Sequence, residues 1–260
     1  MDLKLRGKTV LITGSSKGIG AACARQFAEQ GCHLHLAARS GDALTMLRDE
    51  LRAQHGVSVD THVLDLGKTE NQMALARACA DVDILINNAG EIPSGPLDSI
   101  SDTAWRDGFD LKVYGYINLC RELYPLMVER KSGVIVNNIG NSGENWDARY
   151  IAGSTGNAAL MAFTRALGGV SLDEGVRVVG VNPGPVATDR MVKIMKRRAL
   201  DWHGDEGRWE ELYAKYPGGR PATSEEVADL ILFLASPRAG YITGTIVTID
   251  GGIASRGSII

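Results

Sequence analysis

The sequence predicts an α/β fold in which a doubly wound, seven-stranded parallel sheet is covered by helices on both faces. Short apolar runs alternate with longer amphipathic segments along the chain, which is the pattern of repeated β-α-β units. Runs such as VLI at 10–12 and VIV at 134–136 show no polar alternation, as expected for strands buried on both faces. The 260 residues are 44% hydrophobic, which suffices for one large core.

The elements follow from these runs in chain order. Each predicted strand is a short, mostly apolar run bounded by glycine or polar residues; the seven are residues 9–13, 33–38, 59–66, 83–90, 133–140, 176–184 and 245–252. Each predicted helix is an amphipathic segment between two such runs; the six are residues 21–30, 42–55, 69–79, 104–130, 155–174 and 224–236. No repeat, low-complexity tract or linker interrupts the alternation, so residues 1–260 are expected to form one domain.

Residues 191–217 depart from the alternation. This segment is rich in charge and carries Trp202, Trp209, Tyr213 and Tyr216. It is too long for an ordinary connection, and long excursions from compact domains are often lids or binding loops. We therefore predict a helical lid. The alternative is a helical insertion whose aromatic side chains only pack against one another.

The overall charge excludes some classes of partner. A formal net charge of −3 gives no electrostatic footprint for nucleic acid or for an anionic membrane. No apolar run reaches the roughly 20 residues that a membrane-spanning helix needs. The N-terminus turns glycine-rich before a signal-peptide hydrophobic region could form. The four cysteines lack metal-type spacing, so we expect reduced thiols, a cytoplasmic location and no metal site.

A glycine-rich turn predicts a nucleotide site. The segment TVLITGSSKGIG places Gly14, Gly18 and Gly20 directly after the first strand and directly before the first helix. Glycines allow a tight turn and a close backbone approach to a pyrophosphate, whose charge is favoured by the helix N-terminus. A tight turn without a ligand is the alternative. The predicted site also includes the other residues of this loop, Ser16, Lys17 and Ile19.

Together with two further motifs, this turn resembles the short-chain dehydrogenase/reductase family. The glycine spacing is G-x-x-x-G-x-G, NNAG follows at 87–90, and NPGPVATD follows at 182–189. The similarity runs nearly end to end, to TGTIVTIDGG at 243–252. It implies a Rossmann-type fold and a nicotinamide dinucleotide. By position, it assigns Asn87, Ala89 and Gly90 to the adenosine ribose, Asp65 and Leu66 to the adenine, and Pro183, Gly184 and Thr188 to the nicotinamide carboxamide.

The end of the second strand favours NADP(H) over NAD(H). An NAD-specific enzyme usually carries an acidic residue there to bind the ribose 2′-hydroxyl. Here the position holds Ala38, followed by Arg39, and Lys17 lies in the glycine loop nearby. Two cations suit a 2′-phosphate, because an arginine can pair with its oxygens in a fork. The alternative is that Arg39 points into solvent.

The positions of the family's catalytic residues are all changed. The family resemblance implies a relay of Asn, Ser, Tyr and Lys, in which Tyr exchanges the substrate proton and Lys holds the nicotinamide ribose. Aligning NAALMAFTRAL places Gly153 at the Tyr position and Asn157 at the Lys position. Counting back along GVIVNNIG places Gly140 at the Ser position, and FDLKVYGYINL places Lys112 at the Asn position. A register shift of three would pair Tyr150 with Ser154 instead, but it would still supply no lysine.

These changes suggest a remodelled site. Asn and Lys have exchanged places, so Lys112 could deliver charge or a proton from the opposite helix. Tyr150 lies three residues before Gly153, and both share a face if the helix begins early enough. We therefore predict Lys112 and Tyr150 as the catalytic groups, with Ser142 orienting an oxygen and Asn157 bonding to the ribose. The alternatives are that Tyr150 only packs the loop and that Ser142 is a turn residue.

Three functions stay open at this stage. One is hydride transfer between NADP(H) and a small carbonyl or alcohol, and another is reduction of an activated C=C bond. The third is a non-catalytic NADP(H)-binding module or regulatory subunit, because losing a positioned acid costs about 10²–10⁴ in rate. The family resemblance also implies a homotetramer or homodimer built on helices 104–130 and 155–174.

Overall fold

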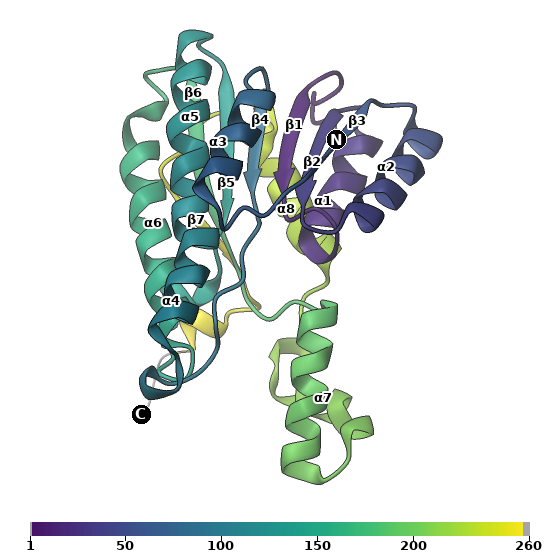
Figure 1. Ribbon diagram of the computed structural model, residues 1–260, viewed down its shortest axis with the longest axis vertical. Helices are drawn as coiled ribbons and strands as arrows, with labels where there is room; N and C mark the ends of the chain where they lie inside the picture. Colours follow the sequence, from purple (N-terminus) through teal and green to yellow (C-terminus); the bar gives the residue numbers. More distant parts are fainter. Residues whose placement is uncertain (1, 257–260) are drawn as a thin grey trace.

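The computed structural model describes residues 2–256, except for the side chains of Arg190 and Ile194, and contains the predicted sheet (Figure 1). All seven strands are parallel, in the order β3-β2-β1-β4-β5-β6-β7. The doubly wound α/β prediction is therefore confirmed. The strands are β1 (Thr9–Thr13), β2 (His33–Ala38), β3 (Val59–Val63), β4 (Ile84–Asn87), β5 (Gly133–Asn138), β6 (Val176–Pro183) and β7 (Ile246–Ile249).

Alternate side chains of the strands build two cores, one on each face of the sheet. In β1, Val10 and Ile12 join one core and Leu11 joins the other. The first core is closed by α1 (Gly18–Glu29), α2 (Gly41–His55) and α8 (Ser224–Ala235), and the second by α3 (Thr69–Ala78), α5 (Gly115–Glu129) and α6 (Ile151–Ser171). Chain order reverses between β1 and β4, so a crevice is expected at the carboxyl ends of these strands.

The predicted helix 104–130 is interrupted by a π-helical turn. The chain runs through α4 (Asp102–Phe109), the π turn η2 (Asp110–Tyr114) and then α5 without leaving the helical region. Lys112 is the central residue of that turn. π-turns inside α-helices are rare and frequently lie at functional sites. The sequence pattern predicted one regular helix, so the turn is a finding of the structure.

The segment predicted as a lid forms a helical arm that projects from the body (Figure 1, green). It consists of α7 (Asp189–His203), η4 (Glu206–Lys215) and η5 (Pro217–Gly219). The remaining short helices are η1 (Leu97–Ser99), η3 (Asn141–Gly143), η6 (Pro237–Ala239) and η7 (Ile253–Ser255). Among the described residues, no helix has the length and apolar character needed to span a membrane.

Candidate active site

A cavity of about 1120 Å³ opens at the carboxyl ends of the strands. Its wall combines the β1–α1 turn, the segments after β2, β3, β4, β5 and β6, the π turn η2 and one side of α7. This is the position where ligands bind in open α/β sheets.

The glycine turn has the geometry that a close approach requires. Gly14 and Gly18 have φ values of +66° and +55°, which other residues rarely adopt. A Cβ on Gly14 would lie 2.9 Å from Ala89 Cα, and one on Gly20 would lie 2.3 Å from Gly14 O. Gly20 therefore packs the helix against the turn and does not line the cavity, whereas Gly14 and Gly18 do. Ser16, Lys17 and Ile19 also line it.

The amides at the start of α1 are available to an anion. Among the described residues, no side chain caps this helix at Lys17. Helix N-terminal amides without an internal partner, together with the helix dipole, favour a phosphate. The turn thus suits the pyrophosphate of a dinucleotide, because Gly14, Ser16 and Gly18 line the cavity beside these amides.

The two asparagines of the NNAG motif have different structural roles. Asn87 is fully buried and donates to Asn137 Oδ1 at 2.9 Å, so it supports the sheet from within and does not line the cavity. Asn88 does line the cavity and donates to Thr13 O at 2.9 Å and to Gly14 O at 3.2 Å. Its own Oδ1 accepts from Asn138. Asn88 was not among the residues predicted from the sequence. Its position directly after Asn87 in the NNAG motif is the signal that could have identified it as a site residue.

The part of the wall after β2, where the sequence predicts the adenosine, carries an ion pair that the sequence did not predict. Arg39 lines the cavity, and its Nη2 lies 3.1 Å from Glu91 Oε2. Their side chains are 66% and 61% exposed, so the pair joins the end of β2 to the segment after β4 at the surface. Leu66 lines the same region, whereas the Oδ1 of Asp65 accepts from the Gly67 amide, and Asp65 lies outside the wall.

The segment after β6 forms a further part of the cavity wall. The predicted residues Pro183, Gly184 and Thr188 all line the cavity, as do Ala89 and Gly90 of the NNAG motif. Thr188 begins the arm, since its Oγ1 caps α7 by accepting from Met191 N at 3.3 Å.

Lys112 reaches the cavity from the π turn. Its stem lies against Gly90, where an added Cβ would be 2.8 Å from Lys112 Cδ. Its Nζ donates to Ile139 O at 2.5 Å, at the end of β5. The side chain is half-buried and lines the cavity. The ammonium group is therefore held at the end of β5, beside the cavity.

Tyr150 occupies the space above Gly153. It is the N-cap residue of α6, with φ −136° and ψ 42°. A Cβ on Gly153 would lie 2.0 Å from Tyr150 Cε1 and 2.1 Å from its Cζ. The helix begins four residues before the predicted 155, and Tyr150 lines the cavity. The phenol ring thus fills the volume in which a side chain at position 153 would begin.

Asn157 and Ser142 support the loop after β5. Asn157 Nδ2 donates to Ser142 Oγ at 2.7 Å, and a Cβ on Gly140 would lie 2.8 Å from that same Nδ2. Gly140 has φ +131°, which strains any other residue. Asn157 and Ser142 do not line the cavity, whereas Gly140 does. The buried Oδ1 of Asn157 has no hydrogen-bond partner among the described residues.

The arm contributes one wall of the cavity through α7. Met191, Met195, Arg198 and Trp202 line it. The other arm aromatics pack among themselves, with ring centroids 5.4 Å apart for Trp209 and Tyr213 and 5.5 Å apart for Tyr213 and Tyr216. The segment therefore borders the cavity and also packs internally, and its role as a lid stays a prediction.

Comparison with known proteins decides the family. Residues 8–199 match the family described as short chain dehydrogenase. The chain belongs to the short-chain dehydrogenase family. It is 32% identical to an uncharacterized oxidoreductase of Bacillus subtilis, YvrD, over 97% of this chain and 98% of that protein.

Two solved structures of the short-chain dehydrogenase fold are similar along their whole length. L-sorbose reductase from Gluconobacter frateurii, complexed with NADPH and L-sorbose, has a TM-score of 0.92 and 32% identity, over 99% of this chain and all of that chain. YwfH, an NADPH-dependent reductase involved in bacilysin biosynthesis, has a TM-score of 0.89 and 28% identity, over 97% of this chain and all of that chain. The cavity therefore lies in a fold that binds NADPH in similar proteins.

Proposed function

We propose that the protein is an NADP(H)-dependent oxidoreductase with a remodelled proton-transfer site. It transfers hydride to or from a carbonyl or alcohol, or to an activated C=C bond. The observation that carries this proposal is that two side chains able to supply charge or a proton, those of Lys112 and Tyr150, line the same cavity as the glycine turn. Tyr150 fills the space at Gly153, and Asn157 fills the space at Gly140. Lys112 fills the space beside Gly90.

The coenzyme would be held by the residues that line the cavity at the glycine turn. The amides of α1 and Ser16 suit the pyrophosphate, and Asn88 fixes the turn. Arg39 and Lys17 provide positive charge where a 2′-phosphate would lie, which favours NADP(H). NADPH is also the coenzyme in the L-sorbose reductase complex. When bound, the coenzyme supplies or accepts the hydride.

Tyr150 would transfer the proton at the substrate oxygen, and Lys112 would stabilise the charge there. The Tyr150 hydroxyl, beside the cavity, would donate a proton to that oxygen during reduction and take it back during oxidation. The Lys112 ammonium, oriented by Ile139 O at 2.5 Å, would stabilise negative charge that develops on the oxygen. In this way positive charge comes from the π turn instead of from α6.

Asn157 and Ser142 would act as positioning residues. Their mutual hydrogen bond of 2.7 Å lies beneath Gly140, and Gly140 lines the cavity. The bond therefore holds the loop that faces the substrate. This role replaces the direct contacts to the ribose and to an oxygen that the sequence suggested for these two residues.

Turnover with matched variants tests the proposal. NADPH and NADH binding would be measured by nicotinamide fluorescence, and oxidation or reduction by absorbance, with L-sorbose, an aryl ketone and an enone as substrates. We expect Lys112→Met and Tyr150→Phe each to lower kcat/KM by about 10²–10⁴ while NADPH still binds. The controls are Lys215→Met and Tyr241→Phe, whose parent side chains are exposed.

Two results would contradict the proposal. Binding of NADPH without turnover of any substrate class would indicate a nucleotide-binding module. Unchanged turnover in Lys112→Met would remove the lysine from the mechanism.

A further inference from the structure

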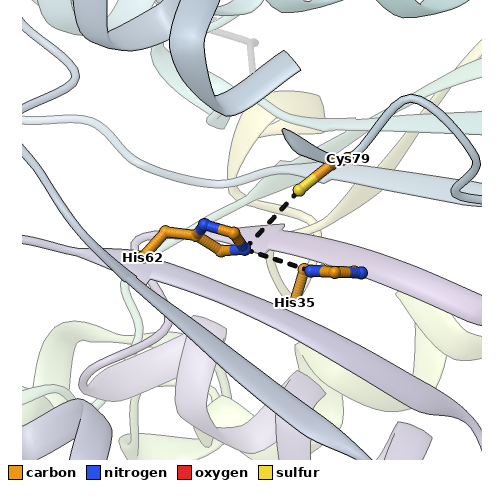
Figure 2. A group of neighbouring side chains, drawn as sticks. All are labelled: His35, His62 and Cys79. Atoms are coloured by element: carbon orange, nitrogen blue, oxygen red, sulfur yellow. Dashed lines mark hydrogen bonds between the residues drawn. The ribbon is translucent and has the colours of Figure 1, made fainter. Parts of the chain in front are cut away.

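Three potential metal ligands converge on the sheet, away from the cavity. His35 lies in β2, His62 lies in β3, and Cys79 is the C-cap residue of α3. In the sheet register, His35 pairs with Asp60 and Ala37 pairs with His62, so the two histidines are diagonal neighbours on one face. Cys79 comes down onto that face from the end of the helix. Figure 2 shows the three side chains directed toward one another.

The distances between the ligand atoms suit a tetrahedral ion. His35 Nδ1 lies 3.0 Å from His62 Nε2, and Cys79 Sγ lies 3.7 Å from the same nitrogen (Figure 2). All three ligand atoms lie within 4.8 Å of one another. A zinc ion with Zn–N near 2.05 Å and Zn–S near 2.3 Å requires about 3.3 Å between nitrogens and about 3.6 Å between nitrogen and sulfur. The two separations given above therefore differ from those of a tetrahedral zinc site by only a few tenths of an ångström.

The surrounding charges favour a cation. The carboxylates of Asp60 and Asp81 act on the Cys79 thiol, and Asp60 also acts on His62. Arg52 offsets Asp60 only in part, at 3.9 Å across an exposed pair. Zn²⁺ binds neutral imidazoles and displaces the proton of a thiol, so binding at these three residues would release a proton from Cys79.

We propose that His35, His62 and Cys79 form a binding site for a zinc-class divalent ion, with a water as the fourth ligand. Two imidazoles and one thiolate match the ligand preference of Zn²⁺, and an open fourth position is common for three-ligand sites. Both histidines are half-buried, which leaves room for that water. The site joins the edge strand β3 to β2 and α3. None of its residues lines the catalytic cavity, so the ion stabilises the fold and does not take part in the reaction.

Cobalt is the spectroscopic probe for this site. Purified wild-type protein, reduced and freed of metal with a chelator, would be titrated with Co²⁺. We expect one equivalent to produce tetrahedral ligand-field bands together with a thiolate-to-cobalt charge-transfer band, and Zn²⁺ to bleach both. At a hundredfold excess over Kd, Zn²⁺ should raise Tm by about 5–10 °C.

Matched variants assign the ligands. Cys79→Ser should abolish the charge-transfer band, and His35→Gln should weaken Co²⁺ binding by at least about a hundredfold. Cys23→Ser and His203→Gln are the controls, because Cys23 lies in the core on the other face of the sheet and His203 is exposed on the arm. NADPH binding checks that each variant is folded.

Three results would overturn the proposal. The first is a wild-type protein that shows neither the cobalt bands nor a Zn²⁺-dependent Tm. The second is a charge-transfer band that persists in folded Cys79→Ser. The third is metal binding that is lost equally in His203→Gln, which would identify an adventitious surface site.

Discussion

Substituting Gly153 by alanine probes whether the position of the Tyr150 ring matters. The added methyl carbon would lie 2.0 Å from Cε1 and 2.1 Å from Cζ of that ring. Non-bonded carbons prefer separations of about 3.5 Å, so the ring must retreat by roughly 1.5 Å. A displacement of about 1 Å in a catalytic group can cost on the order of 10² in rate. We therefore expect kcat/KM of Gly153→Ala to fall about a hundredfold, with NADPH affinity unchanged.

Gly169 on the same helix is the matched control. It lies within α6, it is exposed, and a Cβ there would meet nothing within 4 Å. Alanine at this position should stabilise the helix by about 0.5–1 kcal/mol and leave kcat/KM unchanged. At Gly153 the same gain is opposed by an overpacking cost of about 1–3 kcal/mol. The Gly153 variant should thus be less stable than the Gly169 variant in urea denaturation.

Each half of this reasoning can be refuted separately. If Gly153→Ala matches Gly169→Ala in kcat/KM, the ring position has no part in turnover and the role of Tyr150 is wrong. If the two variants gain the same stability, the ring does not fill the space above Gly153.

The remaining predictions concern the coenzyme, the loop after β5 and acid stability. Arg39→Gln should raise the Kd for NADPH about 10–100-fold and leave the Kd for NADH unchanged, because charge-assisted hydrogen bonds contribute about 1.5–3 kcal/mol. Glu91→Gln should lower the Kd for NADPH by up to about fivefold, because it releases Arg39 from an exposed ion pair. Gly140→Ser should destabilise the protein by about 1–3 kcal/mol, because position 140 has a φ of +131°, and it should not raise turnover. A variant that is as stable as wild type and more active would contradict the proposed site. Arg220 and the Thr223 amide lower the pKa of Glu226 to about 2. The contribution of the Glu226 carboxylate to stability is therefore complete above the ordinary pKa of 4.5 and is lost as pH falls toward 2. In urea titrations, the difference in unfolding free energy between wild type and Glu226→Gln should shrink over that pH range.

The sequence predicted the strands and the glycine turn because both depend on local pattern. All seven strands lie within their predicted ranges. The predictions 59–66, 83–90 and 133–140 were too long, since these strands end at Val63, Asn87 and Asn138. The excess residues are mostly apolar or belong to motifs, so periodicity alone could not separate them from the strands. They form loops that contribute to the wall of the cavity.

Features that arise from contacts between distant segments were not predictable. The Arg39–Glu91 pair depends on where two separate strands end. The cluster of His35, His62 and Cys79 depends on the diagonal register of β2 against β3 and on where α3 ends. Neither has a recognisable spacing in the sequence. The π turn at Lys112 depends on packing that no amphipathic pattern reveals.

Filled space at the changed positions does not by itself distinguish an enzyme from a binding module. A protein without catalytic selection would also avoid a void, because a large-to-small core change costs about 2–5 kcal/mol. Lys112 is the discriminating residue. Its stem fills the space at Gly90, a task that the unbranched, uncharged side chain of methionine could also perform without placing an ammonium group in a half-buried position. If the amine is retained for chemistry, Lys112→Met should be at least as stable as wild type while its turnover falls, which is the trade-off expected of a functional site. If stability falls together with turnover, the amine serves the fold, and the binding module becomes the better account.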